Sequence, residues 1–477
     1  MAQMIVGGVP RAATSGAVTE IRNPANGELV DTVPRGEAAD VAEAVAAASR
    51  ALPGWARTAA HKRAAVLLRA AELIGERAAE LANLLTREQG KPLRESSLEL
   101  ARFGDILRYY AGLADKLRGE YVPLAERDKY GLVVHQPIGV CAAIVPWNYP
   151  VHLMGSKIAP ALVAGNTVVV KPASTTPLTS IRCVELFLEA GLPPGVLNIV
   201  TGPGGTVGEA LLIHPDVRKI AFTGETATGK HVMEVAAREV KRVTLELGGS
   251  DPMIVCDDAD LDAAAAAATI NRFWNAGQTC IATKRLYVFE DVADEFLGKL
   301  VGRVERLKVG DGLARDTRMG PLHTARQREE VEAMVADAVA RGARVVTGGA
   351  RPQGDEYAKG HYYLPTLLEN VDPASRIARE ECFGPALPIF RVRDLDEAIA
   401  GANDSPYGLG SSIWTRDLAR ARAAAERLEA GYTWINAVQI DHDELPFGGY
   451  KQSGYGKERG VEALAHYTES KSIVVAS

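Results

Sequence analysis

Long apolar runs, clustered charge and paired cysteines are all lacking in this 477-residue sequence. No stretch approaches the roughly 18 apolar residues of a membrane-spanning helix, and residues 1–22 lack the basic start and apolar core of a secretory signal. The net charge of -6 is spread along the chain, which argues against a basic nucleic-acid-binding protein. We therefore expect a cytoplasmic protein with no nucleic-acid and no membrane partner.

Cysteine is scarce, and its pattern excludes two further classes of site. The chain has only Cys141, Cys183, Cys256, Cys280 and Cys382. An odd number of widely spaced cysteines in mostly apolar surroundings is typical of reduced thiols rather than of a disulfide framework. No CxxC pair or His/Cys cluster is present, so we expect no metal site.

The alternation of predicted elements indicates the fold class. The chain is too long for one core, and residues 38–117 have helical periodicity. From residue 132 onward strands alternate with helices, which predicts βαβ units and a mostly parallel sheet. A second series of this kind runs from residue 252, through an alanine-rich helix capped by Asp260, to about residue 435. The tail, 467–475, reads as a strand without a hairpin partner, so it must pair far away or with another subunit.

Cys280 is the most informative residue of the chain. A thiol becomes a nucleophile only where its pKa is lowered or its proton is removed. Glu246, an isolated acid on an apolar strand 34 residues earlier, would have a raised pKa and is a candidate base. Asn148 follows another apolar run and offers an amide donor. The alternatives are an inert buried thiol, a surface carboxylate and a turn-forming asparagine.

Three successive predicted strands end in turns that suit a phosphate-bearing ligand. They are Lys171–Ser174, the glycine-rich turn at 202–208 and Gly224…Gly229, which opens a helix. Each turn alone is weak evidence, since such turns are often only tight connections. Together they predict a crevice at the carboxyl edge of one sheet.

With these residues the chain resembles the aldehyde dehydrogenase superfamily over nearly its whole length. The resemblance rests on six motifs in family order and spacing: Pro146–Pro150, Gly224…Gly229, Glu246–Gly249, Gly277–Cys280, Glu381–Pro385 and Pro446–Lys451. It implies an α/β fold of two Rossmann-like parallel-sheet domains plus a small β oligomerisation arm. By matching position, residues 1–118 and 139–247 form the NAD(P)-binding domain, 248–448 the catalytic domain, and 119–138 with 449–477 the arm of a homotetramer or homodimer.

The resemblance also implies the chemistry. Cys280 is the expected nucleophile, Glu246 the base that activates the deacylating water, and the Asn148 side chain with the Cys280 backbone N–H the oxyanion hole. An aldehyde would thus become a carboxylate through a thiohemiacetal and a thioester, with hydride transferred to NAD⁺ or NADP⁺.

Cofactor contacts follow by matching position. Lys171 and Glu381 would hold the two riboses, and Phe383 would pack near the nicotinamide. The further expected contacts are Trp147, Ser174, Gly204, Gly224, Glu225, Thr226, Gly229 and Leu247. Ser174 stands where many members have a glutamate that repels a 2′-phosphate, so we expect NADP⁺ use, alone or alongside NAD⁺. The alternative is a neutral exchange in an NAD⁺ enzyme.

Two further positions depart from the family pattern. Glu225 replaces a common serine beside the pyrophosphate, so its side chain should turn away or pair with Lys230. Cys382 replaces an aliphatic residue and is either a packing residue or a redox-sensitive thiol.

The expected substrate pocket has aromatic walls at Tyr149, Trp274 and Phe447. Ser156, Thr279, Ile281 and Asp441 are also assigned to it. The loop 439–444 is acidic, which favours a cationic aldehyde such as an aminoaldehyde; a merely solvated loop is the alternative. A semialdehyde or another small aldehyde is equally compatible.

Three other functions compete with this interpretation. A CoA-acylating semialdehyde dehydrogenase would generally lack the base, and Glu246 is present. A non-catalytic binding protein of the same fold would not need Cys280, Glu246 and Asn148 together. A thiol esterase would need no cofactor cleft.

Overall fold

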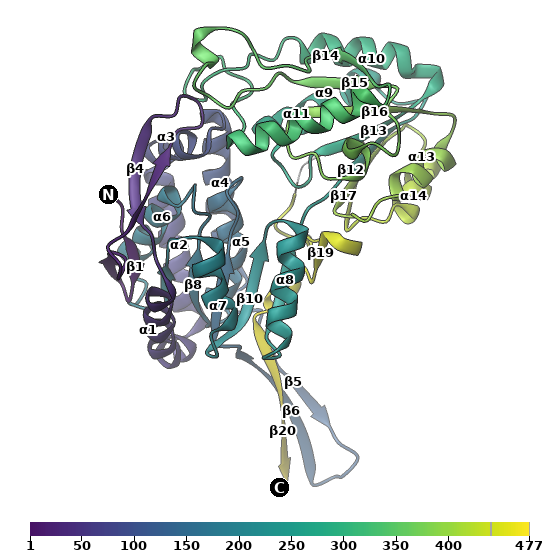
Figure 1. The fold of residues 1–477 in the computed structure, drawn as a ribbon. Coiled ribbons are helices and arrows are strands. Elements are labelled where there is room, and N and C mark those ends of the chain that lie inside the picture. The colour runs from purple at the N-terminus through teal and green to yellow at the C-terminus, as the bar shows by residue number, and fades with distance from the viewer. Residues whose placement is uncertain (439–440, 477) are drawn as a thin grey trace.

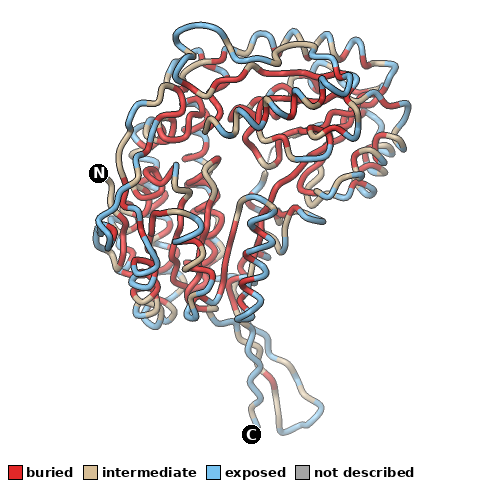
Figure 2. The backbone as a smooth tube through the Cα atoms, in the orientation of Figure 1, coloured by how far each residue is buried: buried red, intermediate tan, exposed pale blue. Residues whose placement is uncertain are grey.

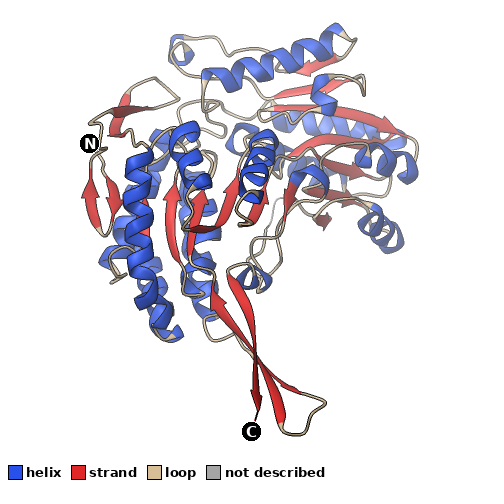
Figure 3. Cartoon of the chain, turned by 60° about the horizontal axis from the view of Figure 1, so that its bottom comes forward, coloured by secondary structure: helices blue, strands red, loops and turns tan. Residues whose placement is uncertain are grey.

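The computed structural model describes residues 1–438 and 441–476. Two mostly parallel sheets covered by helices lie one above the other, and a narrow β arm projects from the lower one (Figures 1 and 3). This arrangement confirms the α/β fold expected from the alternating pattern. No helix in the described ranges is both long and apolar enough to cross a membrane.

The first sheet has a parallel centre with antiparallel edges. Its order is β19-β11-β10-β7-β8-β9-β1-β2, and β7 to β11 pair in parallel. The strands are β1 (Met4–Val6), β2 (Val9–Arg11), β7 (Val140–Ile144), β8 (Thr167–Lys171), β9 (Leu197–Ile199), β10 (Val217–Thr223), β11 (Arg242–Glu246) and β19 (Gly454–Tyr455). Part of the C-terminal segment thus belongs to this sheet rather than to the arm.

Helices cover both faces of the first sheet because its central strands are apolar on both sides. Cys141 and Ala143 face one core, whereas Ala142 and Ile144 face the other, as the period of two in a strand requires. The first core contains α2 (Ala60–Glu76), α3 (Ala78–Gln89), α4 (Leu93–Gly112), α5 (Pro150–Val163) and α6 (Leu178–Glu189). The second contains α1 (Ala38–Arg57), α7 (Glu209–Ile213) and α8 (Thr226–Ala237).

The second sheet is the one expected from residue 252 onward. Its order is β14-β15-β16-β13-β12-β17-β18, with only β14 antiparallel. The strands are β12 (Asp251–Val255), β13 (Thr283–Phe289), β14 (Arg344–Thr347), β15 (Thr366–Glu369), β16 (Ala386–Val392), β17 (Gly410–Trp414) and β18 (Tyr432–Ile435). Its helices are α9 (Leu261–Phe273), α10 (Glu290–Val304), α11 (Ala325–Ala340), α12 (Arg376–Arg379), α13 (Leu395–Asn403) and α14 (Leu418–Arg427). The Asp260 side chain caps α9 as expected, accepting from the Ala263 N–H at 3.0 Å.

The C-terminal strand pairs with a segment more than 300 residues earlier, which resolves its missing partner. β20 (Thr468–Ala476) runs antiparallel to β6 (Lys129–Pro137), which also pairs with β5 (Glu120–Pro123). These strands form the projecting arm, whose residues are mostly exposed or of intermediate burial (Figure 2). A short α15 (Glu462–Ala465) precedes β20, and a separate hairpin joins β3 (Val18–Arg22) to β4 (Leu29–Pro34).

The parallel order places five loops at one edge of the first sheet. The chain leaves β7 at Val145, β8 at Pro172, β9 at Val200, β10 at Gly224 and β11 at Leu247. Carboxyl ends of parallel strands meet at the same edge, where doubly wound sheets bind ligands. A π-helical turn, Gly204–Gly208, lies within the glycine-rich turn predicted at 202–208 and precedes α7.

Candidate active site

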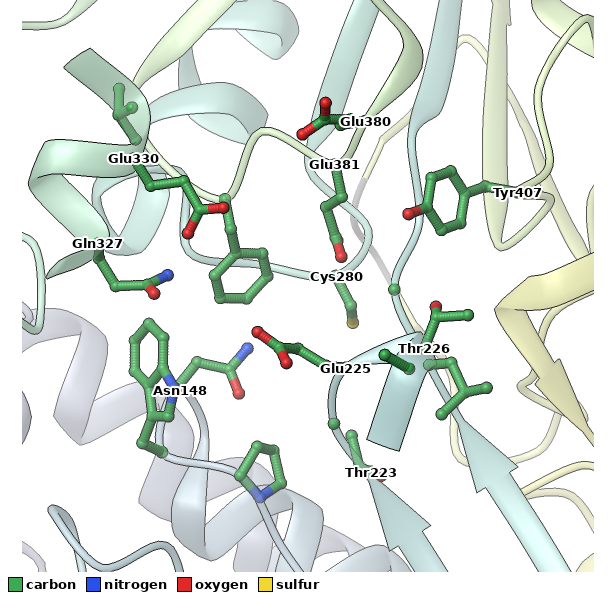
Figure 4. Close-up of a pocket in the computed structure, with 18 of the residues that line it drawn as sticks. Asn148, Thr223, Glu225, Thr226, Cys280, Gln327, Glu330, Glu380, Glu381 and Tyr407 are labelled. Carbon is green, nitrogen blue, oxygen red and sulfur yellow. The ribbon is translucent and has the colours of Figure 1, made fainter. Parts of the chain in front are cut away.

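A cavity of about 330 Å³ lies at this edge, and its lining comes from both sheets (Figure 4). Residues of the first sheet meet residues of the second across it. The predicted site residues that line it are Trp147, Asn148, Gly224, Glu225, Thr226, Leu247, Cys280, Glu381 and Phe383. Of the expected cofactor contacts, Lys171, Ser174, Gly204 and Gly229 do not line it.

A second cavity, of about 390 Å³, lies on the other side of Cys280. Among the expected pocket residues, Tyr149, Trp274, Thr279, Ile281, Asp441 and Phe447 line it. Cys280 is the residue common to the linings of these two cavities. Its thiol is therefore placed where ligands bound in the two cavities would meet.

The loop before Cys280 has an unusual backbone. Asn275 and Ala276 adopt left-handed conformations with φ of 50° and 52°, and Gly277 follows with φ of 74°. A Cβ at Gly277 would lie 2.3 Å from the Gly384 carbonyl oxygen, so only glycine fits there. The Lys284 ammonium group then holds the end of the loop, donating to the Cys280 carbonyl at 2.6 Å. These contacts fix the position of the thiol.

The Cys280 thiol is protonated at neutral pH in this state. Burial raises its pKa to about 12; Lys284 opposes the shift, and Glu246 adds to it. A thiol in this environment needs a base before it can attack a carbonyl carbon.

Asn148 is held over the same loop. Its side-chain Nδ2 donates to the Gln278 carbonyl at 3.1 Å. The Asn148 backbone carbonyl accepts from the Lys91 Nζ at 2.5 Å, and Lys91 in turn pairs with Glu99 at 2.6 Å. All four side chains are buried. An amide fixed in this way can present an N–H to an oxygen atom near the thiol.

Glu246 lies close to Cys280 in the fold but is turned away from both cavities. Within the part of the chain that the structure describes, Glu246 lines neither cavity. Its Oε1 lies over Gly448, where a Cβ would approach to 2.5 Å, and has no hydrogen-bond partner among the described residues. Burial raises the pKa of Glu246 well above its usual value, and the neighbouring Glu458 adds to the shift.

Sequence reasoning missed the charged residues that surround Glu246. Lys157 on α5 donates to Glu458 at 2.7 Å and to the Thr223 hydroxyl at 2.7 Å, and both Lys157 and Lys457 lower the pKa of Glu246. The signal was available, because Lys157 is the only cation in a helix that is otherwise almost wholly apolar.

The expected cofactor residues outside the cavity lining lie on the adjacent turns. Lys171 donates to the Pro172 carbonyl at 2.8 Å, and the Ser174 hydroxyl donates to the Gly202 carbonyl at 2.8 Å. A Cβ at Gly204 would meet nothing within 4 Å, whereas one at Gly229 would lie 2.3 Å from Leu247. The Gly229 position thus lets α8 approach the strand end closely.

The opposite wall contains two further expected contacts. Glu381 accepts from the Gly249 N–H at 3.0 Å and pairs with Lys284 at 3.1 Å. Phe383 meets the Trp147 ring edge to face at 5.6 Å. His323, which the sequence did not single out, stacks on Trp147 at 4.6 Å and bonds to the Thr175 hydroxyl at 2.7 Å.

Two expected positions differ in the structure. Glu225 does not turn away: its side chain points into the first cavity (Figure 4), and Lys230 pairs with Gln452 at 2.9 Å instead. Ser156 does not line the second cavity; it is buried, and its hydroxyl faces the His152 carbonyl at 3.4 Å. Every residue of α5 is buried, so periodicity could not indicate which face meets the cavity.

The acidic loop is not a region of unopposed negative charge. Asp441 lies 2.5 Å from Arg459, and Asp443 lies 3.4 Å from Arg102. These pairs oppose the charge of two of the loop's three carboxylates, which weakens the electrostatic basis for the expected acidic mouth. Gln439 and Ile440, the first residues of that loop, lie outside the described residues. Cys382 is a packing residue here, buried beside Arg272, which donates to its sulfur at 3.4 Å.

Comparisons with known proteins agree with this geometry. The family model described as the aldehyde dehydrogenase family matches residues 11–473. An Escherichia coli structure described as an NADP-dependent enzyme is 41% identical with a TM-score of 0.97, covering 100% of this chain and 98% of its own. PnpE in complex with nicotinamide adenine dinucleotide is 42% identical with a TM-score of 0.98, covering 100% and 97%.

A third match is a betaine aldehyde dehydrogenase from Staphylococcus aureus in complex with NAD⁺. It is 38% identical with a TM-score of 0.97, and the match covers 99% of this chain and 94% of that one. Sequence and structure thus agree along the whole length, and the chain belongs to the aldehyde dehydrogenase family.

Proposed function

We propose that this protein oxidises a small aldehyde to a carboxylate with NADP⁺ or NAD⁺ as the hydride acceptor. The supporting observation is the position of Cys280 between two cavities, one lined by the phosphate-type turn of α8 and one by apolar and aromatic side chains. An aldehyde in the second cavity would meet the thiol and the first cavity at once. Initial rates of NADH and NADPH formation with short aliphatic, aromatic, semialdehyde and amino aldehydes test this directly.

The first cavity suits a dinucleotide. Thr226 opens α8, whose N-terminus favours a phosphate group. At Gly248 a Cβ would lie 2.2 Å from Glu381 Oε2. The glycine therefore leaves a space beside Glu381 that any larger residue would fill. Lys171 and Glu381 would hold the riboses, and Trp147 and Phe383 the nicotinamide. When bound, the nicotinamide supplies the hydride acceptor. On this proposal residues 1–118 and 139–247 are the cofactor-binding domain and 248–448 the catalytic domain.

The chain's own residues perform the remaining steps. The Cys280 thiol gives its proton to a water molecule and so to solvent, and the thiolate Sγ then forms a bond to the aldehyde carbon as the carbonyl electron pair moves to the oxygen. The Asn148 amide and the Cys280 backbone N–H donate to the resulting oxyanion. Once hydride has left, the acyl group is held as a Cys280 thioester. Glu246, rotated from Gly448, takes a proton from water, and the hydroxide releases the carboxylate and the thiol.

Removal of the Asn148 donor is expected to lower kcat by about 10²–10³-fold, the usual effect of losing one oxyanion-hole donor. Asn148→Ala tests this, because the alanine leaves the Asn148 carbonyl and its bond to Lys91 in place. Steady-state kinetics should give an unchanged cofactor KM. Asn166→Ala is not a suitable control, because the Asn166 side chain donates to the carbonyl of Tyr467, just before β20. Asn26 lies on an exposed turn, so Asn26→Ala is the control and should retain wild-type kcat. A kcat for Asn148→Ala within threefold of wild type would show that the Asn148 amide is not part of the oxyanion hole.

Cofactor preference should depend on Ser174. A carboxylate at this position would accept ribose hydroxyls and repel a 2′-phosphate. We expect Ser174→Glu to lower kcat/KM for NADP⁺ at least tenfold, on the scale of one charge contact at about 1.4 kcal/mol, while NAD⁺ is retained. Ser174→Gln, which adds the same bulk without charge, is the control. Equal losses with both cofactors in both variants would contradict the charge argument.

The arm supports a proposal for assembly. Tyr121 and Val474 are large apolar residues exposed on β5 and β20, and such exposure is typical of a protein interface. We assign 119–138 and the C-terminal strand to a homodimer or homotetramer contact.

A further inference from the structure

Five side chains form a network of charges at one end of the second cavity, and the proposed chemistry uses none of them. Arg459 Nη2 lies 2.5 Å from Asp441 Oδ2 and donates to His152 Nε2 at 2.5 Å. Arg102 Nη2 lies 3.4 Å from Asp443 Oδ1 and donates to the Asp441 backbone carbonyl at 2.8 Å. Two carboxylates therefore face two guanidinium groups. We call these five residues the charge network.

The members of the central pair differ in burial. The Arg459 side chain is 2% exposed, whereas that of Asp441 is 21% exposed, so the carboxylate is the more accessible partner. Burial would raise the pKa of Asp441, but the Arg459 guanidinium outweighs it and holds that pKa well below its usual range. Asp441 thus stays ionised at the cavity wall, and the adjacent Arg459 guanidinium group opposes its charge.

The rest of the cavity carries little free charge. Its other walls are mainly apolar or aromatic, including Leu98, Leu153 and Ile270. Glu99 is paired with Lys91 at 2.6 Å. Burial raises the pKa of Glu95 to about 8, so this carboxyl group is mostly protonated at neutral pH. Within the described lining, the charge network is therefore the main source of electrostatic discrimination.

We infer that Arg459 is a specificity-determining residue: it cancels the charge of Asp441, so that the cavity accepts aldehydes with uncharged tails and gains nothing from a cationic one. The inference deepens the proposed function and rests on it, because it takes the second cavity as the aldehyde site. A cation near this network is attracted by Asp441 and Asp443 and repelled by Arg459 and Arg102, so the Coulomb terms of the two carboxylates and the two guanidinium groups offset one another.

Removal of either Arg459 or Asp441 should leave the charge of the other less opposed. Arg459→Met leaves Asp441 with Arg102, which lies 3.7 Å from its carboxylate and is 29% exposed, and with His152 at 3.5 Å, so a cationic tail should gain. Asp441→Asn leaves Arg459 unopposed by its nearest carboxylate, so a cationic tail should lose. The double variant restores the balance. These opposite signs separate charge compensation from general damage to the cavity.

The test uses two aldehydes of the same shape. Betaine aldehyde and 3,3-dimethylbutanal differ in a single atom, a quaternary nitrogen against a quaternary carbon. The ratio of their kcat/KM values is compared between variants, which cancels their intrinsic reactivities. We expect Arg459→Met to raise the ratio about tenfold and Asp441→Asn to lower it about tenfold, the scale of one unit charge partly screened at several ångströms. The double variant should lie near wild type.

Arg108→Met is the matched control. Arg108, on α4, likewise has a carboxylate partner, Asp105 at 3.1 Å, but both are exposed and neither lines the second cavity within the described residues. Its ratio should equal that of the wild type. Ratios within twofold of wild type in both single variants would overturn the inference. If Arg459→Met fails to fold, the nearly isosteric Asp441→Asn decides alone.

A second readout does not need turnover. Methanethiosulfonates with neutral and cationic head groups modify the thiol of Cys280, and the other four cysteines are buried. NADP⁺ is added to occupy the first cavity. The ratio of the modification rate with the cationic reagent to that with the neutral reagent should then rise in Arg459→Met and fall in Asp441→Asn, as for the kcat/KM ratio. No turnover of any aldehyde by the wild type would overturn the proposed function, whereas unshifted modification ratios would overturn the inference about Arg459.

Discussion

Cys280→Ala is expected to abolish NADH and NADPH formation with every aldehyde, a loss on the order of 10⁴-fold or more, as for removal of the nucleophile of other covalent catalysts. The physical reason is that hydride cannot leave a planar aldehyde carbon as it can leave a tetrahedral adduct. Cys280 is the residue shared by the two cavities, so no neighbouring thiol can substitute. Initial-rate assays with both cofactors measure the loss.

The matched control is Cys183→Ala. Cys183 is buried on α6 and lines neither of the two cavities, so its removal should leave kcat within a few-fold of wild type. Cys280→Ala should still bind the cofactor, because the alanine removes only the sulfur from the first cavity. Quenching of tryptophan fluorescence measures this binding. Turnover by Cys280→Ala above 1% of wild type would show that oxidation does not pass through this thiol.

The fold could be predicted well because its signals are local or periodic. Alternating strands and helices gave the two parallel sheets, and the absence of a hairpin partner for the tail gave its distant pairing with β6. What the periodicity could not show was the turn of π-helix at Gly204–Gly208 or the antiparallel edge strand Gly454–Tyr455. The edge strand depends on its pairing with β11, which lies far earlier in the chain.

The candidate site was predictable as a set of residues but not as an arrangement. Six motifs identified Cys280, Glu246 and Asn148, and the order of the strands brings them to one region. The direction of the Glu246 side chain is set by Gly448 and by the Lys157–Glu458 pair, which lie 89 to 212 residues away in sequence. Charge counted along the sequence likewise misjudged Asp441, because its partner Arg459 comes from beyond the acidic loop.

Glu246→Gln should separate hydride transfer from release of the acid. We expect a burst of about one NAD(P)H per subunit, followed by a steady state lowered about 10²–10⁴-fold, the range for loss of a general base. Glutamine keeps the shape of the side chain but cannot take a proton from water, so the thioester accumulates. Rapid-mixing absorbance measures the burst, and mass spectrometry of the quenched protein measures the acyl group on Cys280.

The pH dependence provides the control on this assignment. Burial and the neighbouring Glu458 raise the pKa of Glu246, so at low pH the carboxyl group is protonated and cannot act as a base. The steady-state rate of the wild type should therefore rise with pH as Glu246 ionises, and this limb should vanish in Glu246→Gln. Added coenzyme A discriminates the acylating alternative: a wild-type rate that depends on it would give Glu246 a different role. If the steady-state rate of Glu246→Gln equals that of the wild type, another group acts as the base. The nearest candidate is the carboxylate of Glu458, which accepts a hydrogen bond from Lys157.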